Sequence, residues 1–239
     1  MIDAVLFDNW NTLVQAPELM RPGASVESFH RSIKSLGFEL DKDRFTEAYR
    51  EIARAQAKES ESCGWKEHDY LGRISLTLQR LDVPDETRTA LAAGAWRSYL
   101  DDWLRLTTFY PETPSVLDSL RGKYRLGMVT NFMDGPVCRL VFDKFGYEQI
   151  FRSLIVSAEE GYLKPSPRLF EKALAELGSA AAGSVMVGDT YDADIVGAHN
   201  AGMRGVLIDP EGKSREHHGD CDAVVKSIGE VPSAIRGLY

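Results

Sequence analysis

Short, nearly continuous apolar runs recur in two parts of the chain, at its beginning and again after residue 105. Runs of this length with many β-branched residues are typical of strands that are buried on both faces. The segments between them show the 3.6-residue periodicity of amphipathic helices. The predicted strands are 2–7, 125–130, 153–156, 184–188, 204–208 and 222–225. Strands that alternate with helices form a parallel sheet covered on both faces, so the pattern predicts an α/β fold.

Residues 15–104 follow a different pattern, in which only the helical periodicity appears. The helical patterns lie in 25–36, 41–53, 67–81 and 85–103. We therefore expect an all-helical insertion at 15–104. It would divide one α/β domain, formed by 1–14 and 105–239, directly after its first strand.

Composition restricts the possible partners. The 239 residues carry a net charge of −8, which argues against binding to nucleic acid or to an anionic membrane surface. No apolar run approaches the roughly 18 residues of a membrane-spanning helix, and no leader pattern precedes the first strand. Cys63, Cys138 and Cys221 are far apart in the sequence, as expected of reduced thiols. We expect a cytoplasmic protein, monomeric or homodimeric.

Polar residues stand at or just after the predicted strand ends. They are Asp8, Thr130, Asp189 and Asp194, with Lys164 held in an extended segment by the proline that follows it. The ends of parallel strands converge on one crevice, so three carboxylates would repel one another there. A hard divalent cation such as Mg²⁺ relieves that repulsion, because it binds carboxylates together with water and substrate oxygens. A lysine and a threonine hydroxyl suit a small anionic substrate opposite the metal.

Four motifs give the chain a family resemblance. They are residues 7–13 (Phe-Asp-Asn-Trp-Asn-Thr-Leu), 129–131 (Val-Thr-Asn), 163–165 (Leu-Lys-Pro), and 187–189 (Val-Gly-Asp) followed by Asp194. In this order the chain resembles the haloacid dehalogenase-like hydrolase superfamily, in the form with a helical cap inserted after the first motif. The resemblance covers the whole length. It implies a Rossmann-like parallel sheet core with an inserted all-helical cap.

The resemblance also implies roles for individual residues. Asp8 would be the nucleophile, and Thr130 and Lys164 would bind and orient both the transferred group and the nucleophile. Trp10 and Asn131 would lie against the substrate.

The same resemblance implies a magnesium site. Mg²⁺ would be held by Asp8, the backbone carbonyl of Trp10 and Asp189, with Asp194 contacting it directly or through water.

Two residues depart from the phosphatase pattern of this superfamily. Phosphatases carry a second Asp two positions after the nucleophile, as the general acid and base, and here that position is Trp10. Asn11 replaces the usual glycine. Because general acid–base catalysis is typically worth about 10²–10⁴ in rate, the loss weakens an ordinary phosphomonoesterase. The favoured hypothesis is still a Mg²⁺-dependent phosphohydrolase of a small phosphorylated metabolite. It would act on a good leaving group, or take its acid and base from the cap or from Asp192.

Three alternatives remain open. Dehalogenase-like displacement of halide from carbon needs no leaving-group proton, and residues 189–193 (Asp-Thr-Tyr-Asp-Ala) parallel the last dehalogenase motif. Those relatives lack the metal carboxylate, however. Phosphonate cleavage needs a cap lysine, for which the candidates are Lys34, Lys42, Lys58 and Lys66. The third alternative is a binding protein that keeps the site without catalysis.

Overall fold

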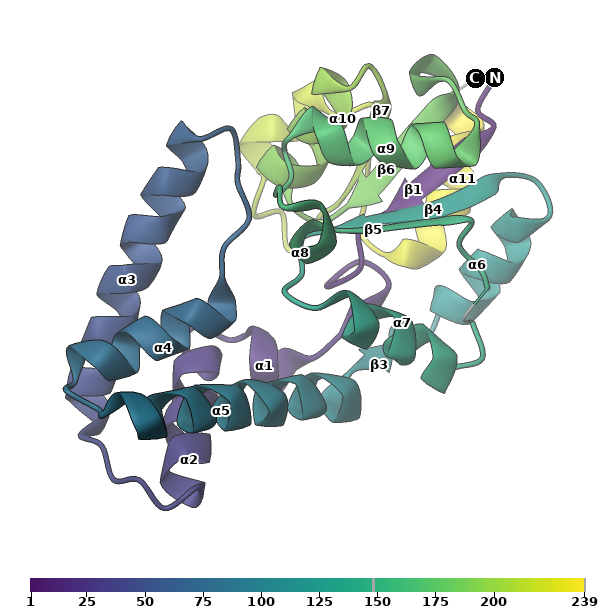
Figure 1. Cartoon of the computed structure of the whole chain (residues 1–239). Coiled ribbons are helices and arrows are strands. Elements are labelled where there is room, and N and C mark those ends of the chain that lie inside the picture. Colours follow the sequence, from purple (N-terminus) through teal and green to yellow (C-terminus); the bar gives the residue numbers. More distant parts are fainter. Residues whose placement is uncertain (148, 239) are drawn as a thin grey trace. The chain divides into compact units, whose positions relative to one another are not determined.

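The computed structural model describes residues 1–147 and 149–238, which form two compact units. Met1–Gln15 and Thr108–Tyr239 make up one of them, here called the α/β unit. Ala16–Thr107 make up the other, here called the helical unit (Figure 1). The chain therefore leaves the α/β unit after its first strand and returns to it to build the rest of the sheet.

The α/β unit is built on one six-stranded parallel sheet with the order β5-β4-β1-β6-β7-β8. Its strands are β1 (Ala4–Phe7), β4 (Arg125–Thr130), β5 (Ser153–Val156), β6 (Ser184–Gly188), β7 (Arg204–Ile208) and β8 (Ala223–Val225). The α/β class and the parallel sheet predicted from the hydrophobic pattern are confirmed, and the fold is Rossmann-like.

Helices cover both faces of this sheet. The α-helices of the unit are α6 (Thr113–Arg121), α7 (Gly135–Lys144), α8 (Ser157–Glu160), α9 (Pro167–Leu177), α10 (Gly197–Asn200) and α11 (Val231–Gly237). Short 3₁₀ helices span Ala181–Gly183, Arg215–Asp220 and Ile228–Glu230. Figure 1 shows α9 and α10 on one face of the sheet and α6 and α7 on the other.

The core against α9 explains why that helix forms where it does. Pro167 is its first residue, and its buried side chains recur at helical spacing: Leu169, Phe170, Ala173, Leu174 and Leu177. They pack on Leu6 of β1, Val129 of β4 and Met186 of β6. Ser166 occupies the N-cap position as predicted, but its side chain makes no capping hydrogen bond.

The strand register brings three chain segments to one edge of the sheet. Phe7, the last residue of β1, lies opposite Met128 of β4 on one side and Val187 of β6 on the other. Since all three strands run in the same direction, the residues that follow them emerge together. The chain runs from β1 through β4 to β5 and then crosses back over β4 and β1 to β6. The boundary between β1 and β6 is therefore the topological switch point, where open α/β sheets bind ligands.

A two-stranded antiparallel ribbon was not predicted from the sequence. It pairs β2 (Val14–Gln15) with β3 (Thr108–Phe109), the segments on either side of the helical unit. Two-residue strands are too short to show a period, so only the tertiary pairing reveals them.

The helical unit contains five helices, namely α1 (Pro17–Met20), α2 (Ala24–Ser35), α3 (Lys42–Ser62), α4 (Tyr70–Arg80) and α5 (Asp85–Leu106). The sequence pattern predicted that the third long segment starts near residue 67, but α4 begins at Tyr70. The reason is the Asp69 side chain, which accepts a hydrogen bond from the Gly72 N–H at 2.7 Å and so caps the helix there.

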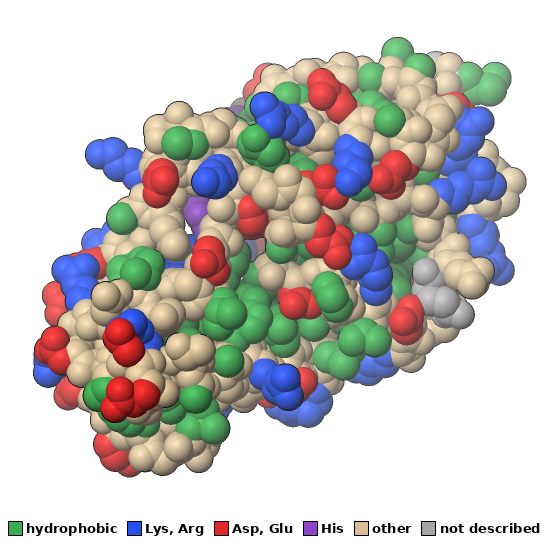
Figure 2. All heavy atoms as spheres, viewed as in Figure 1, with side chains coloured by type: hydrophobic (Ala, Val, Ile, Leu, Met, Phe, Trp, Pro, Cys, Tyr) green, Lys and Arg blue, Asp and Glu red, His purple; other side chains and the backbone are tan. Residues whose placement is uncertain are grey.

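The surface and helix lengths agree with the composition. Acidic and basic side chains are interspersed over the face drawn in Figure 2. Within residues 1–147 and 149–238, no helix is long and apolar enough to cross a membrane. The cysteines Cys63, Cys138 and Cys221 are all free thiols.

Candidate active site

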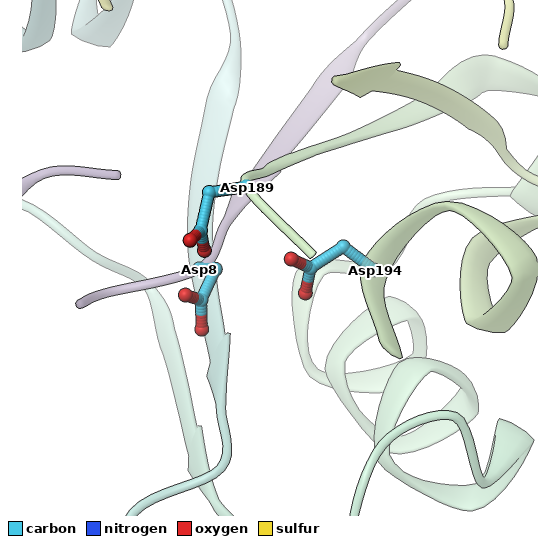
Figure 3. Close-up of side chains that lie close together, drawn as sticks. All are labelled: Asp8, Asp189 and Asp194. Atoms are coloured by element: carbon cyan, nitrogen blue, oxygen red, sulfur yellow. The ribbon is translucent and has the colours of Figure 1, made fainter. Parts of the chain in front are cut away.

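Three carboxylates meet at the strand edge described above. Asp8 directly follows β1, Asp189 directly follows β6, and Asp194 lies in the helical turn after β6. One oxygen of each lies within 4.8 Å of the others. In Figure 3 the Asp8 and Asp189 carboxylates lie side by side, and the Asp194 carboxylate points toward them. The structure thus brings together the three acidic residues that the sequence analysis selected.

Lys164 joins two of these carboxylates. Its Nζ donates to Asp8 Oδ1 at 2.7 Å and to Asp194 Oδ1 at 2.6 Å, and the residue is only 4% exposed. Burial by itself would lower the pKa of Lys164, but the attraction of Asp194 and Asp8 outweighs it and raises the pKa. The ammonium is therefore charged, and it holds one oxygen of Asp8 in a fixed position.

One ammonium does not balance three carboxylates. Burial, followed by repulsion from Asp8 and Asp194, raises the pKa of Asp189 from 3.8 to about 7. Burial also raises the pKa of Asp194, despite the Lys164 contact. Such shifts are typical of sites in which negative charge is crowded and a cation is needed. A donor set made only of carboxylate oxygens suits a hard divalent ion, so these residues fit a metal such as Mg²⁺.

A single-turn π-helix, Tyr191–Val196, places Asp194. The sequence pattern predicted an α-helix from 195 to 200, whereas the structure has this π-helix followed by α10. The wider turn allows the Thr190 N–H to donate to Asp194 Oδ2 at 2.9 Å. π-Helical turns are frequent at functional sites, which agrees with the position of this one.

Gly188 allows the close approach of Asp194. A Cβ atom on Gly188 would lie 2.2 Å from Asp194 Oδ2 and 2.3 Å from its Cγ. Any side chain at this last residue of β6 would therefore displace the carboxylate. The glycine of the Val-Gly-Asp motif is needed for space.

Thr130 is the last residue of β4 and is fully buried. No residue that the structure describes forms a hydrogen bond with its Oγ1. A buried hydroxyl without a partner is destabilising, typically by about 1–3 kcal/mol. The hydroxyl is therefore available to a ligand at this strand end, where the sequence analysis expected an anionic group.

Asn131 binds the backbone of Lys164 rather than leaving its side chain exposed to a ligand. Its Oδ1 accepts the Lys164 N–H at 2.7 Å, and its Nδ2 donates to the Lys164 carbonyl at 3.1 Å. Both ends of the amide are occupied in this way. The geometry makes Asn131 a residue that positions Lys164.

Trp10 is buried, with 7% of its surface exposed. Its ring packs against Phe132 with centroids 4.6 Å apart. An indole cannot exchange a proton with a leaving group, so this position supplies no general acid. Asp192, the acidic neighbour considered as a substitute, is exposed on the π-helix.

Asn11 has a contact that sequence reasoning missed. Its backbone φ of +61° lies in the left-handed region, which asparagine tolerates better than most residues. Its Nδ2 donates to Asp189 Oδ2 at 3.2 Å. The sequence indicated only that Asn11 stands where phosphatases of the resembled superfamily carry a glycine. It did not indicate that the Asn11 side chain contacts Asp189.

Comparisons with known proteins agree with this geometry. Residues 2–202 match the family model of the haloacid dehalogenase-like hydrolases. The chain is 28% identical over 215 residues to ribulose-1,5-bisphosphate 5-phosphatase of Halopiger xanaduensis, covering 90% of this chain and 87% of the relative. It is 34% identical over 218 residues to glyceraldehyde 3-phosphate phosphatase of Pyrococcus abyssi, covering 86% and 81%.

A solved structure agrees with the fold. The 2-haloacid dehalogenase from Pseudomonas syringae pv. tomato matches over the full length of both chains, with a TM-score of 0.77 and 22% identity. At that identity the likeness concerns the fold alone.

Proposed function

The chain belongs to the haloacid dehalogenase-like hydrolases, and we propose that it is a Mg²⁺-dependent phosphohydrolase acting on a small phosphorylated metabolite. The observation that carries the proposal is the buried cluster of Asp8, Asp189 and Asp194 with Lys164 between two of its members. Relatives named as phosphatases of glyceraldehyde 3-phosphate and ribulose 1,5-bisphosphate support it. In this proposal the α/β unit carries the chemistry and the helical unit is the cap.

The proposed reaction has two steps at Asp8. A carboxylate oxygen attacks the phosphorus, and the bond from phosphorus to the substrate oxygen breaks, leaving a phosphoryl group on Asp8. A water molecule then attacks that phosphorus, and inorganic phosphate leaves as the Asp8 carboxylate is restored. A carboxylate paired with the Lys164 ammonium attacks without a general base to activate it.

The neighbours of Asp8 stabilise the charges of this reaction. Lys164 orients the nucleophile through Oδ1, and its charge also attracts the phosphoryl oxygens. The unpartnered Thr130 hydroxyl donates to one of those oxygens. Asp8, Asp189, Asp194 and the Trp10 carbonyl would hold Mg²⁺, which when bound would offset the negative charge of the carboxylates and the phosphate.

The packed Trp10 ring restricts the substrate. Without an acid at this position the leaving oxygen must depart as a stabilised anion, or it must take its proton from solvent. We therefore expect activity to depend strongly on the pKa of the leaving group. Esters with acidic leaving groups are hydrolysed fastest.

The carboxylate cluster favours phosphoryl transfer over the dehalogenase alternative. Displacement of halide from carbon moves one negative charge from Asp8 to the halide and needs no divalent ion. The half-buried carboxylate of Asp189 would then bring an unfavourable charge with no function. Phosphoryl transfer needs the ion that Asp189 helps to bind.

Hydrolysis of p-nitrophenyl phosphate tests the proposal, measured with Mg²⁺ and with EDTA and repeated with Asp8→Asn. Its leaving group needs no proton, so the missing acid does not hide a working nucleophile. Release of p-nitrophenol that requires both Mg²⁺ and Asp8 supports the proposal. No release, together with halide release from 2-chloropropionate, would replace it with dehalogenase chemistry. No turnover of either compound would leave a binding role.

A further inference from the structure

A small pocket lies in the α/β unit beside the carboxylate cluster. It is lined by Asn11, Tyr110 and Asp189, by Ile208 at the end of β7, and by residues 209–211, 213 and 214 of the loop that follows. We call it the β7 pocket. Its volume is about 230 Å³. Because Asn11 and Asp189 belong both to the pocket and to the edge of the cluster, a ligand can occupy the two together.

The outer wall of the β7 pocket is held by one buried carboxylate. Asp209 is 8% exposed and accepts hydrogen bonds from the backbone N–H groups of Lys213 at 2.9 Å and Ser214 at 3.0 Å. His218 Nε2 lies 2.8 Å from Asp209 Oδ2, the oxygen that also accepts from the Ser214 N–H. The loop is therefore folded around Asp209, and the pocket keeps its shape without a ligand.

The charges around the β7 pocket do not suit a second phosphate. Lys213 is the single basic residue among those lining it, and its Nζ is paired with Glu211 at 2.9 Å. Asp189 and Asp209 add negative charge on the other sides. A phosphate dianion in the pocket would be repelled by these carboxylates, and no unpaired cation lines the pocket to bind it. Its binding is therefore unfavourable.

Neutral hydrogen-bonding groups suit the lining better. Tyr110 and Ser214 each carry a hydroxyl, which both donates and accepts. Asn11 uses its Nδ2 for Asp189, which leaves its carbonyl oxygen as an acceptor. Hydroxyl groups of a ligand would match these side chains without introducing charge.

The size of the pocket limits the ligand to a short chain. The volume of 230 Å³ is smaller than the roughly 300–1,000 Å³ of pockets that hold drug-sized ligands. Asp189 lines the pocket, and one of its oxygens lies within 4.8 Å of an Asp8 oxygen. A phosphoryl group on Asp8 is therefore separated from the pocket by about this distance. Because a carbon chain zigzags, about four carbon–carbon bonds of roughly 1.5 Å each are needed to span that distance.

We propose that the β7 pocket binds the uncharged, hydroxylated end of a short-chain phosphomonoester while its phosphate lies at Asp8. This assignment rests on the proposed phosphohydrolase function and deepens it. Among alkyl phosphates, which share similarly poor leaving groups, the preferred substrates carry one phosphate and a chain of about three to five carbons with free hydroxyls. Asn11 and Tyr110 contact that chain from the core side, and Ser214 contacts it from the loop.

Glycerol 3-phosphate and n-propyl phosphate provide the test. Because the hydroxyls also make glycerol the better leaving group, the preference is measured in the wild type and in variants that lack the pocket hydroxyls. The kcat/KM of the protein with Mg²⁺ is measured for both. The expected result is a preference of about tenfold or more for glycerol 3-phosphate, since a net hydrogen bond between neutral groups is worth roughly 3- to 10-fold. Equal values would overturn the pocket assignment. The phosphohydrolase proposal would stand, because both esters would still be turned over.

Conservative variants test which side chains bind the hydroxyl groups of the ligand. Tyr110→Phe and Ser214→Ala each remove one hydroxyl from the pocket, and each is expected to lower the preference about threefold to tenfold. Tyr147→Phe and Ser115→Ala remove the same groups at positions outside the pocket and serve as matched controls. A preference that survives both pocket variants would place hydroxyl recognition elsewhere and overturn the assignment.

A bisphosphate ester distinguishes a second anion site from a hydroxyl site. If 1,3-propanediol bisphosphate is preferred to n-propyl phosphate, and Lys213→Met removes that preference, the pocket binds a second phosphate and the assignment is wrong. If neither ester nor p-nitrophenyl phosphate is turned over, the proposed function falls. In that case, calorimetric titration of the Asp8→Asn variant with each ester, in the presence of Mg²⁺, tests the pocket. If glycerol 3-phosphate and n-propyl phosphate bind equally, or if neither binds, the pocket assignment is overturned.

Discussion

Asn131 binds Lys164 at both of its backbone polar groups, accepting the N–H at 2.7 Å and donating to the carbonyl at 3.1 Å. The two residues are 33 positions apart. This double contact fixes the Lys164 backbone against the end of β4. Its ammonium consequently reaches Asp8, just after β1, and Asp194 on the π-helix at the same time.

Asn131→Ala is expected to lower kcat about 100-fold with a smaller effect on KM, because misplacement of a reacting group by about 1 Å has effects of that size. Steady-state kinetics on p-nitrophenyl phosphate measures both. Asn200→Ala, at an exposed asparagine, is the control and should behave as the wild type. A variant that changes KM alone would instead assign Asn131 to substrate contact.

Asp8→Asn is expected to lower turnover on the order of 10⁴-fold or more, as removal of a nucleophile does in other hydrolases. The substitution removes one negative charge from a crowded site, and Lys164 keeps its contact with Asp194. The Tm should therefore not fall. Activity near that of the wild type would remove Asp8 from the nucleophile role.

Trp10→Asp is expected to raise kcat for alkyl phosphates about 10- to 100-fold by supplying the missing acid. It also removes the packing against Phe132, so the free energy of unfolding should fall by about 3 kcal/mol. Trp10→Asn loses the same packing without gaining an acid and is the matched control. Equal rates for the two variants would show that a carboxyl group at this position does not assist the reaction.

Gly188→Ala is expected to displace Asp194, since the new Cβ would lie 2.2 Å from its Oδ2. The affinity for Mg²⁺ should fall about tenfold or more, as it does when supporting residues of metal sites are changed. Titration of Mg²⁺ against activity measures the change. Gly229→Ala, where the nearest atom is 3.5 Å from the added Cβ, is the control and should keep the affinity of the wild type.

The pKa of Asp189, raised to about 7, predicts a pH dependence of stability. Because the folded-state pKa lies above the unfolded value of 3.8, the folded state binds the proton more tightly. This stabilisation is complete below the unfolded pKa and is lost as the pH rises through about 7. The Tm of the metal-free protein should therefore fall over this window.

We expect Mg²⁺ to reverse that loss by binding the ionised carboxylates. The increase in Tm on adding Mg²⁺ should thus be larger near pH 8 than near pH 5, as measured by thermal unfolding with Mg²⁺ and with EDTA. Asp189→Asn is expected to flatten the pH dependence of the metal-free protein. A Tm that rises with pH between 5 and 8 in the presence of EDTA would contradict the assignment.

The sequence alone determined the parallel α/β sheet, and it singled out the polar residues at the strand ends. Both follow from local patterns: apolar runs define the buried strands, and Asp8, Thr130 and Asp189 stand where those runs stop. Parallel strands bring such ends to a common edge, so no side-chain geometry was needed to expect a shared site.

Only the tertiary structure decided how the side chains at that edge are used. Asn131 holds Lys164, Asn11 reaches Asp189 across 178 positions, and Trp10 packs on Phe132. The β7 pocket likewise depends on a loop folded around Asp209. These contacts depend on rotamers and on the close approach of distant segments, and residue spacing along the chain encodes neither.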